Sequence, residues 1–266
     1  MGSLVTYQGG KQKYAKRIID HISPKGKFID CCSGSGAITL ELLNRGYNAA
    51  DITMIDIGCM AKVFKKLTEG NLDIDKMRQL VLPIKEDVKI CPDYLRELTK
   101  SPFSEEIYLI LQAGSFGGKQ VGYNGEWQHA GFRNYWLPTA TSSRKSPVNP
   151  MMPMPDTLIL RAETLQHQLQ GSGLTVLDVD LKEFNVQLLD AESVFYIDPP
   201  YDGVEAYHDS FDYNLTLQQA IGHFDQVYAS EYSPLSSNYF TFEQSGKGGV
   251  SGKRGKKQTE HLSKLK

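Results

Sequence analysis

A short apolar segment that leads into a glycine-containing turn restricts the possible folds of this chain more than any other feature. Lys27–Cys32 (KFIDCC) is expected to form a buried strand, Ser33–Gly36 a turn, and a helix should follow to about Gly46. The same order of strand and helix returns at Asp51–Asp56 and Met60–Leu67. This alternation predicts an α/β fold, a Rossmann-like doubly wound sheet that is mostly parallel.

The segments on either side extend the alternation. Lys11–Ile22 is expected to be an amphipathic helix, because Ile18, Ile19 and Ile22 recur on one face at helical spacing. The second half of the chain also alternates between helical and strand-like patterns. Its expected elements are a helix at Asp156–Gln170, a strand at Leu174–Val179, a short helix at Lys182–Leu189, a strand at Ser193–Ile197, a helix at Leu217–Phe224 and a strand at Gln226–Ser230.

The middle of the chain interrupts this pattern. After Leu95 it is rich in glycine and aromatic residues, and its turn signals favour hairpins and loops over helices. Ser146–Pro155 (SPVNPMMPMP) contains too many prolines for extended regular structure. We therefore expect a core domain made of residues 1–70 and 156–266, with residues 71–155 inserted between its two halves.

Composition narrows the class of protein. Apolar residues make up 40% of the chain and charged residues 23%, as in an ordinary globular domain. There is neither a secretory signal nor an apolar stretch long enough to span a bilayer, so we expect a cytoplasmic protein with no membrane partner. The four cysteines form no CxxC pair, which argues against a disulfide framework and against a metal site.

The net charge of −2 means that any contact with nucleic acid would depend on a local basic patch. Residues 107–155 carry an excess of basic residues, namely Lys119, Arg133, Arg144 and Lys145 against Glu126. Gly246–Lys266 has seven basic residues against the single Glu260. Both segments could meet phosphate, but the second is equally typical of a solvated tail. The central segment is therefore the stronger candidate.

Two features indicate a nucleotide-like ligand. Gly34 and Gly36 would let a ligand approach the backbone closely, just before a helix N-terminus that favours electronegative groups. Asp56 ends the next strand about 20 residues later, where a carboxylate can accept hydrogen bonds from both ribose hydroxyls of a nucleoside. A purely structural turn and a helix cap are the alternatives. Taken together, the two features favour an adenosine-containing cofactor.

Phe195–Tyr201 (FYIDPPY) is the motif with the most specific chemistry. Its apolar strand delivers Asp198 to the carboxyl edge of the sheet, and Pro199 and Pro200 fix the following turn. An amino group conjugated to a purine ring is a poor nucleophile, and Asp198 with the Pro199 carbonyl could accept its two hydrogens. Tyr201 would stack on the base, a contact worth about 1–3 kcal/mol. An ordinary turn is disfavoured by the position of the motif after an apolar strand and downstream of the glycines.

These motifs resemble those of the Dam-like, D12 class of DNA adenine N6-methyltransferases, of the type whose target-recognition segment lies between the cofactor and catalytic motifs. The similarity extends from Tyr7 to about Tyr232, and Tyr7-Gln8-Gly9-Gly10-Lys11 resembles the opening motif of the family. The resemblance implies a class I methyltransferase fold with S-adenosylmethionine as the cofactor. It also implies double-stranded DNA as the partner, in the cytoplasm of a bacterial or phage-infected cell.

The resemblance also implies a role for each motif. The catalytic residues would be Asp198, Pro199, Pro200 and Tyr201. The cofactor-binding residues would be Tyr7, Lys11, Asp30, Cys32, Gly34, Gly36, Asp56, Asp180 and Asp198. The insertion resembles a target-recognition hairpin, whose expected DNA contacts are Lys119, Tyr123, Asn124 and Arg133. The implied reaction is methyl transfer to N6 of a flipped-out adenine, with no metal.

Other methyl acceptors and a non-catalytic DNA-binding relative are the alternatives. Cytosine-N4 enzymes that resemble this chain usually have serine in place of Asp198, and protein-glutamine enzymes have asparagine. A non-catalytic protein would not need a carboxylate aimed at an amino group. Adenine in DNA is favoured, and adenine in RNA stays open. Cys32 replaces the usual phenylalanine of the family, so its packing against the cofactor is expected to differ.

Overall fold

The computed structural model describes residues 2–7, 9–134, 136–137, 153–199, 213–243 and 259–266. The chain forms two compact units, each built from separate stretches of sequence. The first contains Met1–Gly10 and Gly58–Gly173, and the second contains Lys11–Ile57 and Leu174–Lys266. Within the described residues, no helix combines the length and apolar character needed to cross a bilayer.

A seven-stranded sheet forms the centre of the second unit. Its strands lie in the order β5-β2-β1-β6-β7-β9-β8. The first five are parallel, and β9 is antiparallel to both β7 and β8. This confirms the predicted α/β fold with a mostly parallel sheet. The strands are β1 (Phe28–Cys31), β2 (Ile52–Asp56), β5 (Thr175–Asp178), β6 (Val194–Ile197), β7 (Gln226–Glu231), β8 (Tyr239–Glu243) and β9 (Thr259–Lys264).

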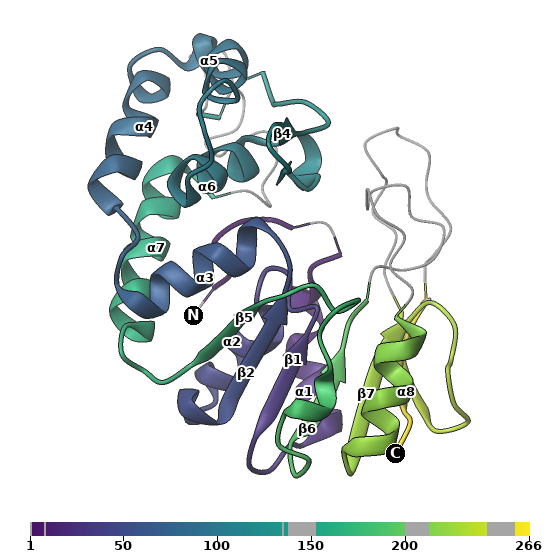
Figure 1. Cartoon of the computed structure of the whole chain (residues 1–266). Helices are drawn as coiled ribbons and strands as arrows, with labels where there is room; N and C mark the ends of the chain where they lie inside the picture. Colours follow the sequence, from purple (N-terminus) through teal and green to yellow (C-terminus); the bar gives the residue numbers. More distant parts are fainter. Residues whose placement is uncertain (1, 8, 135, 138–152, 200–212, 244–258) are drawn as a thin grey trace. The chain divides into compact units, whose positions relative to one another are not determined.

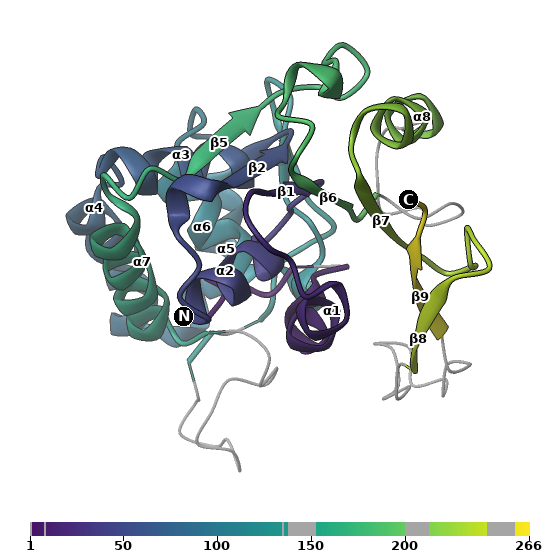
Figure 2. The same cartoon turned by 90° about the horizontal axis from the view of Figure 1, so that it is seen from below.

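Helices cover both faces of this sheet. The helices α1 (Ala15–Ile22) and α2 (Ala37–Asn44) lie on one face, and α8 (Asn214–His223) lies on the other (Figures 1 and 2). Both β1 and β6 are buried along their whole length, as expected for inner strands covered on both sides. The predicted doubly wound arrangement is therefore present.

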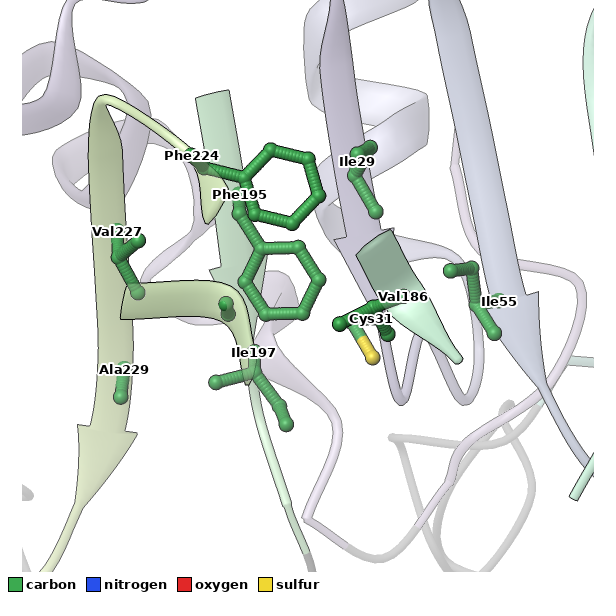
Figure 3. Packing of buried hydrophobic residues seen from close by; sticks show 10 residues of the cluster. Ile29, Cys31, Ile55, Val186, Phe195, Ile197, Phe224, Val227 and Ala229 are labelled. Carbon is green, nitrogen blue, oxygen red and sulfur yellow. The ribbon is translucent and has the colours of Figure 1, made fainter. Parts of the chain in front are cut away.

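The face under α8 holds an apolar cluster of the second unit (Figure 3). The rings of Phe195 and Phe224 are stacked with their centroids 4.9 Å apart. Ile29 and Ile197 of the neighbouring strands pack in the same cluster, and all four side chains are at most 2% exposed. Burying such side chains contributes about 1.5–3 kcal/mol each, so this cluster fixes β1 and β6 firmly side by side.

One helix prediction in the second unit was wrong. Lys182–Leu189 was expected to be a short helix, but only Val186–Leu188 forms a 3-10 turn. The Asp180 carboxylate accepts a hydrogen bond from the Lys182 backbone, and the Asn185 side chain accepts one from the Gln187 backbone. These local hydrogen bonds satisfy the backbone without a helix.

The C-terminal run was also interpreted incorrectly in part. Thr259–Lys264, which looked like the end of a solvated tail, forms β9 between β7 and β8. Leu262 and Ser263 are completely buried there. Residues 244–258, which contain most of the basic residues of this run, lie outside the described part of the chain.

The first unit is mainly helical. Its helices are α3 (Cys59–Glu69), α4 (Ile74–Glu86), α5 (Cys91–Leu98), α6 (Glu105–Gly114) and α7 (Pro155–Leu169), and a small hairpin is formed by β3 (Gly122–Tyr123) and β4 (Trp127–Gln128). The hairpin was predicted, but α6 was not, because loops were expected after Leu95. Ser104 caps α6 by accepting a hydrogen bond from the Ile107 backbone. Residues 106–114 are all buried, so α6 has no polar face that could reveal helical periodicity.

The compact units do not divide the chain at the expected positions. The first unit includes α3 and α7, which pack against each other, so its borders lie at Gly58 and Gly173. The expected insertion ran from residue 71 to residue 155. The assignment of residues 1–70 and 156–266 to catalysis and of residues 71–155 to target recognition is a functional division, and it stays a prediction.

Candidate active site

The carboxyl edge of the parallel strands gathers the chemistry-bearing residues of the second unit. The neighbouring strands β2, β1 and β6 end at Asp56, Cys31 and Ile197, and the glycine turn and Asp198 follow directly. Ligands of open α/β sheets bind outside the carboxyl ends of the strands. The fold therefore brings the glycine turn, Asp56 and Asp198 to one edge, as the sequence predicted.

The glycine turn is held in a conformation that requires glycine. Gly34 and Gly36 have φ angles of 49° and 70°, in the left-handed region that other residues rarely adopt. The Ser33 N–H donates to the Ile55 carbonyl, and the Gly36 N–H donates to the Ser33 carbonyl. These bonds tie the turn to β2 and direct the chain into α2, which begins at Ala37.

Asp56 is bound to the glycine turn. Its Oδ2 accepts a hydrogen bond from the Gly34 N–H at 2.5 Å. Removal from water is the main reason that the pKa of the Asp56 carboxyl is raised to about 6. The charges of Asp178 and Asp198 act in the same direction, whereas the backbone N–H groups of Gly34 and Ile57 act against it. The carboxylate therefore lies in a negatively charged environment that a cationic ligand would stabilise.

Asp30 lies deeper than Asp56 and ties β1 to α2. It is 1% exposed, and its Oδ2 accepts hydrogen bonds from the Thr39 N–H at 3.1 Å and from the Thr39 hydroxyl at 2.7 Å. Burial raises the pKa of the Asp30 carboxyl to about 7, and the charges of Asp198 and Asp56 act in the same direction. Both hydrogen bonds come from the first turn of α2, so Asp30 fixes the start of the helix that directly follows the glycine turn.

Cys32 follows β1 with a φ angle of 57°, which is unusual for a residue other than glycine. Hydrogen bonding to the neighbouring Cys31 thiol and burial raise the pKa of the Cys32 thiol well above its ordinary value. The thiol therefore stays protonated at neutral pH and is a poor nucleophile. Cys32 can contribute packing next to the glycine turn in place of the phenylalanine typical of the resembled family.

Asp198 pairs with a lysine that lies far from it in the sequence. Its Oδ1 is 2.6 Å from Nζ of Lys11, and the same Nζ is 3.0 Å from Oε1 of Glu260. The side chains of Lys11 and Glu260 are 5% and 2% exposed, whereas that of Asp198 is 15% exposed. Asp198 is thus the member of this cluster with the most access to a ligand. Its backbone N–H donates to the Cys31 carbonyl, which fixes its place beside β1.

Two acidic residues at this edge were missed in the sequence. Asp178, and not Asp180, ends β5, and Asp178 pairs in register with Asp56. Asp180 lies just beyond the strand, where its carboxylate accepts the Lys182 N–H at 2.9 Å. The expected strand, Leu174–Val179, already contained Asp178, and the assignment of Asp180 to cofactor binding stays a prediction. Glu260 was missed because the C-terminal run was considered only as a basic segment or a solvated tail, and not as a strand.

Of the other predicted residues, Pro199 is buried directly after Asp198 in the second unit, and Tyr7 and the expected DNA contacts lie in the first unit. The Tyr7 hydroxyl accepts a hydrogen bond from the Gln120 side chain at 2.7 Å, which joins the opening motif to the segment before the hairpin. Lys119 and Asn124 are exposed, and Tyr123 is half-buried. Arg133 is only 7% exposed, and burial lowers the pKa of its guanidinium. Lys119 and Asn124 are therefore the more accessible of the expected DNA contacts.

An aromatic cluster supports the hairpin. The ring centroid of Tyr123 lies 5.4 Å from that of Phe103 and 5.0 Å from that of Trp127. The indole N–H of Trp127 donates to the Ser101 carbonyl at 2.8 Å. Trp127 is 8% exposed and Trp136 is completely buried, so the two tryptophans stabilise the first unit. The predicted catalytic residues Pro200 and Tyr201 lie outside the described residues.

The strand order and the residues at the carboxyl edge define a class I methyltransferase fold. Residues 7–109 match the family of D12 class N6 adenine-specific DNA methyltransferases. This match covers a little under two fifths of the chain and includes the opening motif, the glycine turn and Asp56, but it ends before Asp198. A comparison with curated proteins gives no match.

The family match confirms the resemblance found in the sequence. It confirms the predicted enzyme class, an N6 adenine-specific DNA methyltransferase, and with it the use of a methyl donor and a DNA substrate.

Proposed function

We propose that the protein transfers a methyl group from S-adenosylmethionine to N6 of an adenine flipped out of duplex DNA. The observation that carries this proposal is the meeting of the glycine turn, Asp56 and Asp198 at the carboxyl edge of one parallel sheet. A cofactor held by the glycine turn and Asp56 would lie next to a base held by Asp198. We also propose a cytoplasmic location, where cellular or phage DNA is accessible.

The residues at this edge fit S-adenosylmethionine chemically. Asp56 offers carboxylate oxygens for two ribose hydroxyls, and Ile57 beside it is an apolar side chain that is 60% exposed and can cover a face of the adenine ring. Burial is the main cause of the raised pKa values of Asp30 and Asp56, and repulsion among these two carboxylates and that of Asp198 adds to it. A sulfonium cation near them would relieve this repulsion.

S-Adenosylmethionine would supply an electrophilic methyl group on a positively charged sulfur. The amino group of adenine must attack this carbon with a lone pair that is delocalised into the ring. Asp198 and the Pro199 carbonyl would accept the two N6 hydrogens and so favour a tetrahedral nitrogen with a localised lone pair. The N–C bond would form as the C–S bond breaks, and N6 would then release a proton, which the Asp198 carboxylate would accept.

Base flipping costs a few kcal/mol and requires compensating contacts in the pocket. Tyr201 would supply one of them by stacking, as the sequence predicted. In the first unit, Lys119 and Asn124 are proposed to contact DNA because both are exposed next to or within the hairpin. Tyr123 packs in the aromatic cluster and would orient the hairpin, and Arg133 would contribute through long-range charge because it is buried.

The first test is transfer of labelled methyl from S-adenosylmethionine to unmethylated duplex DNA, with digestion of the product to nucleosides. Wild-type protein is expected to label N6-methyldeoxyadenosine. Asp198→Ala should lower the rate at least about 100-fold, because a polar group aligned with the reacting atoms typically contributes that much. Asp190→Ala is the matched control, since Asp190 is exposed and pairs with Lys27 away from Asp198.

The outcomes separate the alternatives. Label in N6-methyladenosine with an RNA substrate but not with DNA would assign the enzyme to RNA. Binding of S-adenosylmethionine and DNA without transfer would support the non-catalytic alternative. Equal rates for wild type and Asp198→Ala would refute the role of this carboxylate.

A further inference from the structure

Glu260 is a completely buried acidic residue in a part of the fold that the catalytic motifs do not include. It lies on β9, opposite Phe242 of β8, and it is 1% exposed. The antiparallel direction of β9 places its first residues at the same end of the sheet as Glu231, the last residue of β7. Glu260 therefore reaches the carboxyl edge of the parallel strands from the beginning of a strand.

Glu260 shares the ammonium group of Lys11 with Asp198. The Nζ atom lies 3.0 Å from Oε1 of Glu260 and 2.6 Å from Oδ1 of Asp198. Two carboxylates and one ammonium give this cluster a formal charge of −1. A buried charge is costly unless it is paired, so the lysine needs at least one of these carboxylates to remain where it is.

The Glu260 carboxylate affects how strongly the Asp198 carboxylate can accept hydrogen bonds. If Lys11 faced Asp198 alone, its charge would offset that of Asp198 and weaken it as a hydrogen-bond acceptor. With Glu260 on the other side, the lysine charge is shared, and Asp198 keeps negative charge toward the amino group of the base. The distances agree with this division, because both carboxylates are within ion-pair distance of one nitrogen atom.

We propose that Glu260 is a positioning residue for methyl transfer: it holds Lys11 beside Asp198 and shares its charge, so that Asp198 remains a strong acceptor for the N6 hydrogens. The proposal rests on the proposed function of Asp198. Glu260 touches neither the base nor the cofactor in this scheme, and it acts only through Lys11.

Glu106 in the first unit provides a matched comparison. It is also 1% exposed and also forms buried ion pairs, although with two lysines, at distances of 3.1 Å to Lys76 Nζ and 3.7 Å to Lys66 Nζ. Its carboxylate accepts the Asp73 N–H and so fixes the start of α4, which is a structural role. Substitution of either glutamate by glutamine removes one buried charge, but only Glu260 contacts Lys11.

The experiment compares wild type, Glu260→Gln and Glu106→Gln in labelled methyl transfer to duplex DNA, with folding checked by circular dichroism and thermal unfolding. Glu260→Gln is expected to lower kcat about 10- to 100-fold, since small displacements of a catalytic group have effects of this size. The KM values for DNA and S-adenosylmethionine should change less than about 3-fold, because a positioning residue acts on the transition state. Glu106→Gln should keep the wild-type kcat.

The pH profile of kcat gives a readout that a structural role would not move. Burial lowers the pKa of Lys11, but the charges of Asp198 and Glu260 outweigh it and raise this pKa above 10.5. Loss of the Glu260 charge should lower the Lys11 pKa and shift the basic limb of the profile to lower pH than in the wild type. Glu106→Gln should keep the wild-type profile.

Glu260→Asp covers the case in which the glutamine variant does not fold. It keeps the charge but shortens the side chain, so the proposal requires a lower kcat and a basic limb shifted in the same direction. A wild-type kcat and pH profile in either folded Glu260 variant would overturn the proposal. An inactive wild-type protein would instead refute the proposed function, so the two failures are distinguishable.

Discussion

Ionised Asp56 is expected to lower the unfolding free energy of the free protein and to strengthen binding of the cofactor. Removal from water, together with the charges of Asp178 and Asp198, raises the pKa of the Asp56 carboxyl from 3.8 to about 6. At neutral pH the folded protein therefore keeps Asp56 ionised in a place that disfavours the charge. The difference in pKa corresponds to about 2–3 kcal/mol of lost stability. The substitution Asp56→Asn removes this cost and keeps an oxygen that can accept the Gly34 N–H.

The sign of the pH dependence follows from the raised pKa. The ionised carboxylate costs most above pH 6, and the cost disappears as the pH falls from the folded pKa near 6 to the ordinary value of 3.8. We expect Asp56→Asn to raise the unfolding free energy by about 2–3 kcal/mol at pH 7.5. This corresponds to an increase in Tm of about 5–10 °C for a protein of this size. The gain should vanish near pH 4.

The same substitution should weaken cofactor binding. Hydrogen bonds to a charged group contribute about 1.5–3 kcal/mol, so the Kd for S-adenosylmethionine should rise about 10- to 100-fold at pH 7.5. Only about a tenth of Asp56 is ionised at pH 5, so the wild-type Kd should rise about tenfold from pH 7.5 to pH 5. Asp30 also titrates in this range, but it is present in both proteins, so the difference between them isolates Asp56.

The assays are thermal unfolding of the free protein and calorimetric titration with S-adenosylmethionine, each at several pH values. Asp225→Asn is the control for the chemical change itself, because Asp225 is exposed just before β7. An Asp56→Asn variant that is less stable than wild type at pH 7.5 would refute the reasoning. So would a stability gain that does not depend on pH.

Two further predictions concern the core and the DNA surface. Phe195→Ala should lower the unfolding free energy by about 3–5 kcal/mol in urea titrations, because Phe195 is completely buried against Phe224; a loss below about 1 kcal/mol would contradict this packing. Lys119→Ala should weaken DNA binding and reduce the slope of log K against log salt by about 0.9; an unchanged slope would remove Lys119 from the interface.

The parallel strands could be predicted because their local patterns are strong. Lys27–Cys32 and Ser193–Ile197 were expected as buried strands, and they contain β1 and β6. Inner strands of a parallel sheet are apolar on both faces, and turn residues mark their ends. Because all such strands point the same way, their carboxyl ends share one edge. The meeting of Asp56 and Asp198 at that edge therefore followed from the predicted parallel direction of the strands.

The helical unit was harder to predict for a physical reason. Recognition of a helix by its pattern relies on a contrast between a buried face and an exposed face, and α6 has none because residues 106–114 are all buried. Gly114 and the glycines that follow it favoured turns in the sequence-based prediction. Ser104 and the acidic residues Glu105 and Glu106 were the usable signal, because a capping serine followed by acidic residues is typical of a helix start.

Glu260 shows why the candidate active site is less predictable than the sheet that carries it. Asp56 is the last residue of a parallel strand and Asp198 directly follows another, so both lie where the sequence of a parallel sheet predicts functional residues. β9 is antiparallel to β7, and it is the beginning of β9 that lies level with the end of β7. The direction of a strand depends on long-range pairing, which the residue pattern does not record. In sheets of this order, carboxylates at the start of the antiparallel strand therefore need the same attention as those at the ends of the parallel strands.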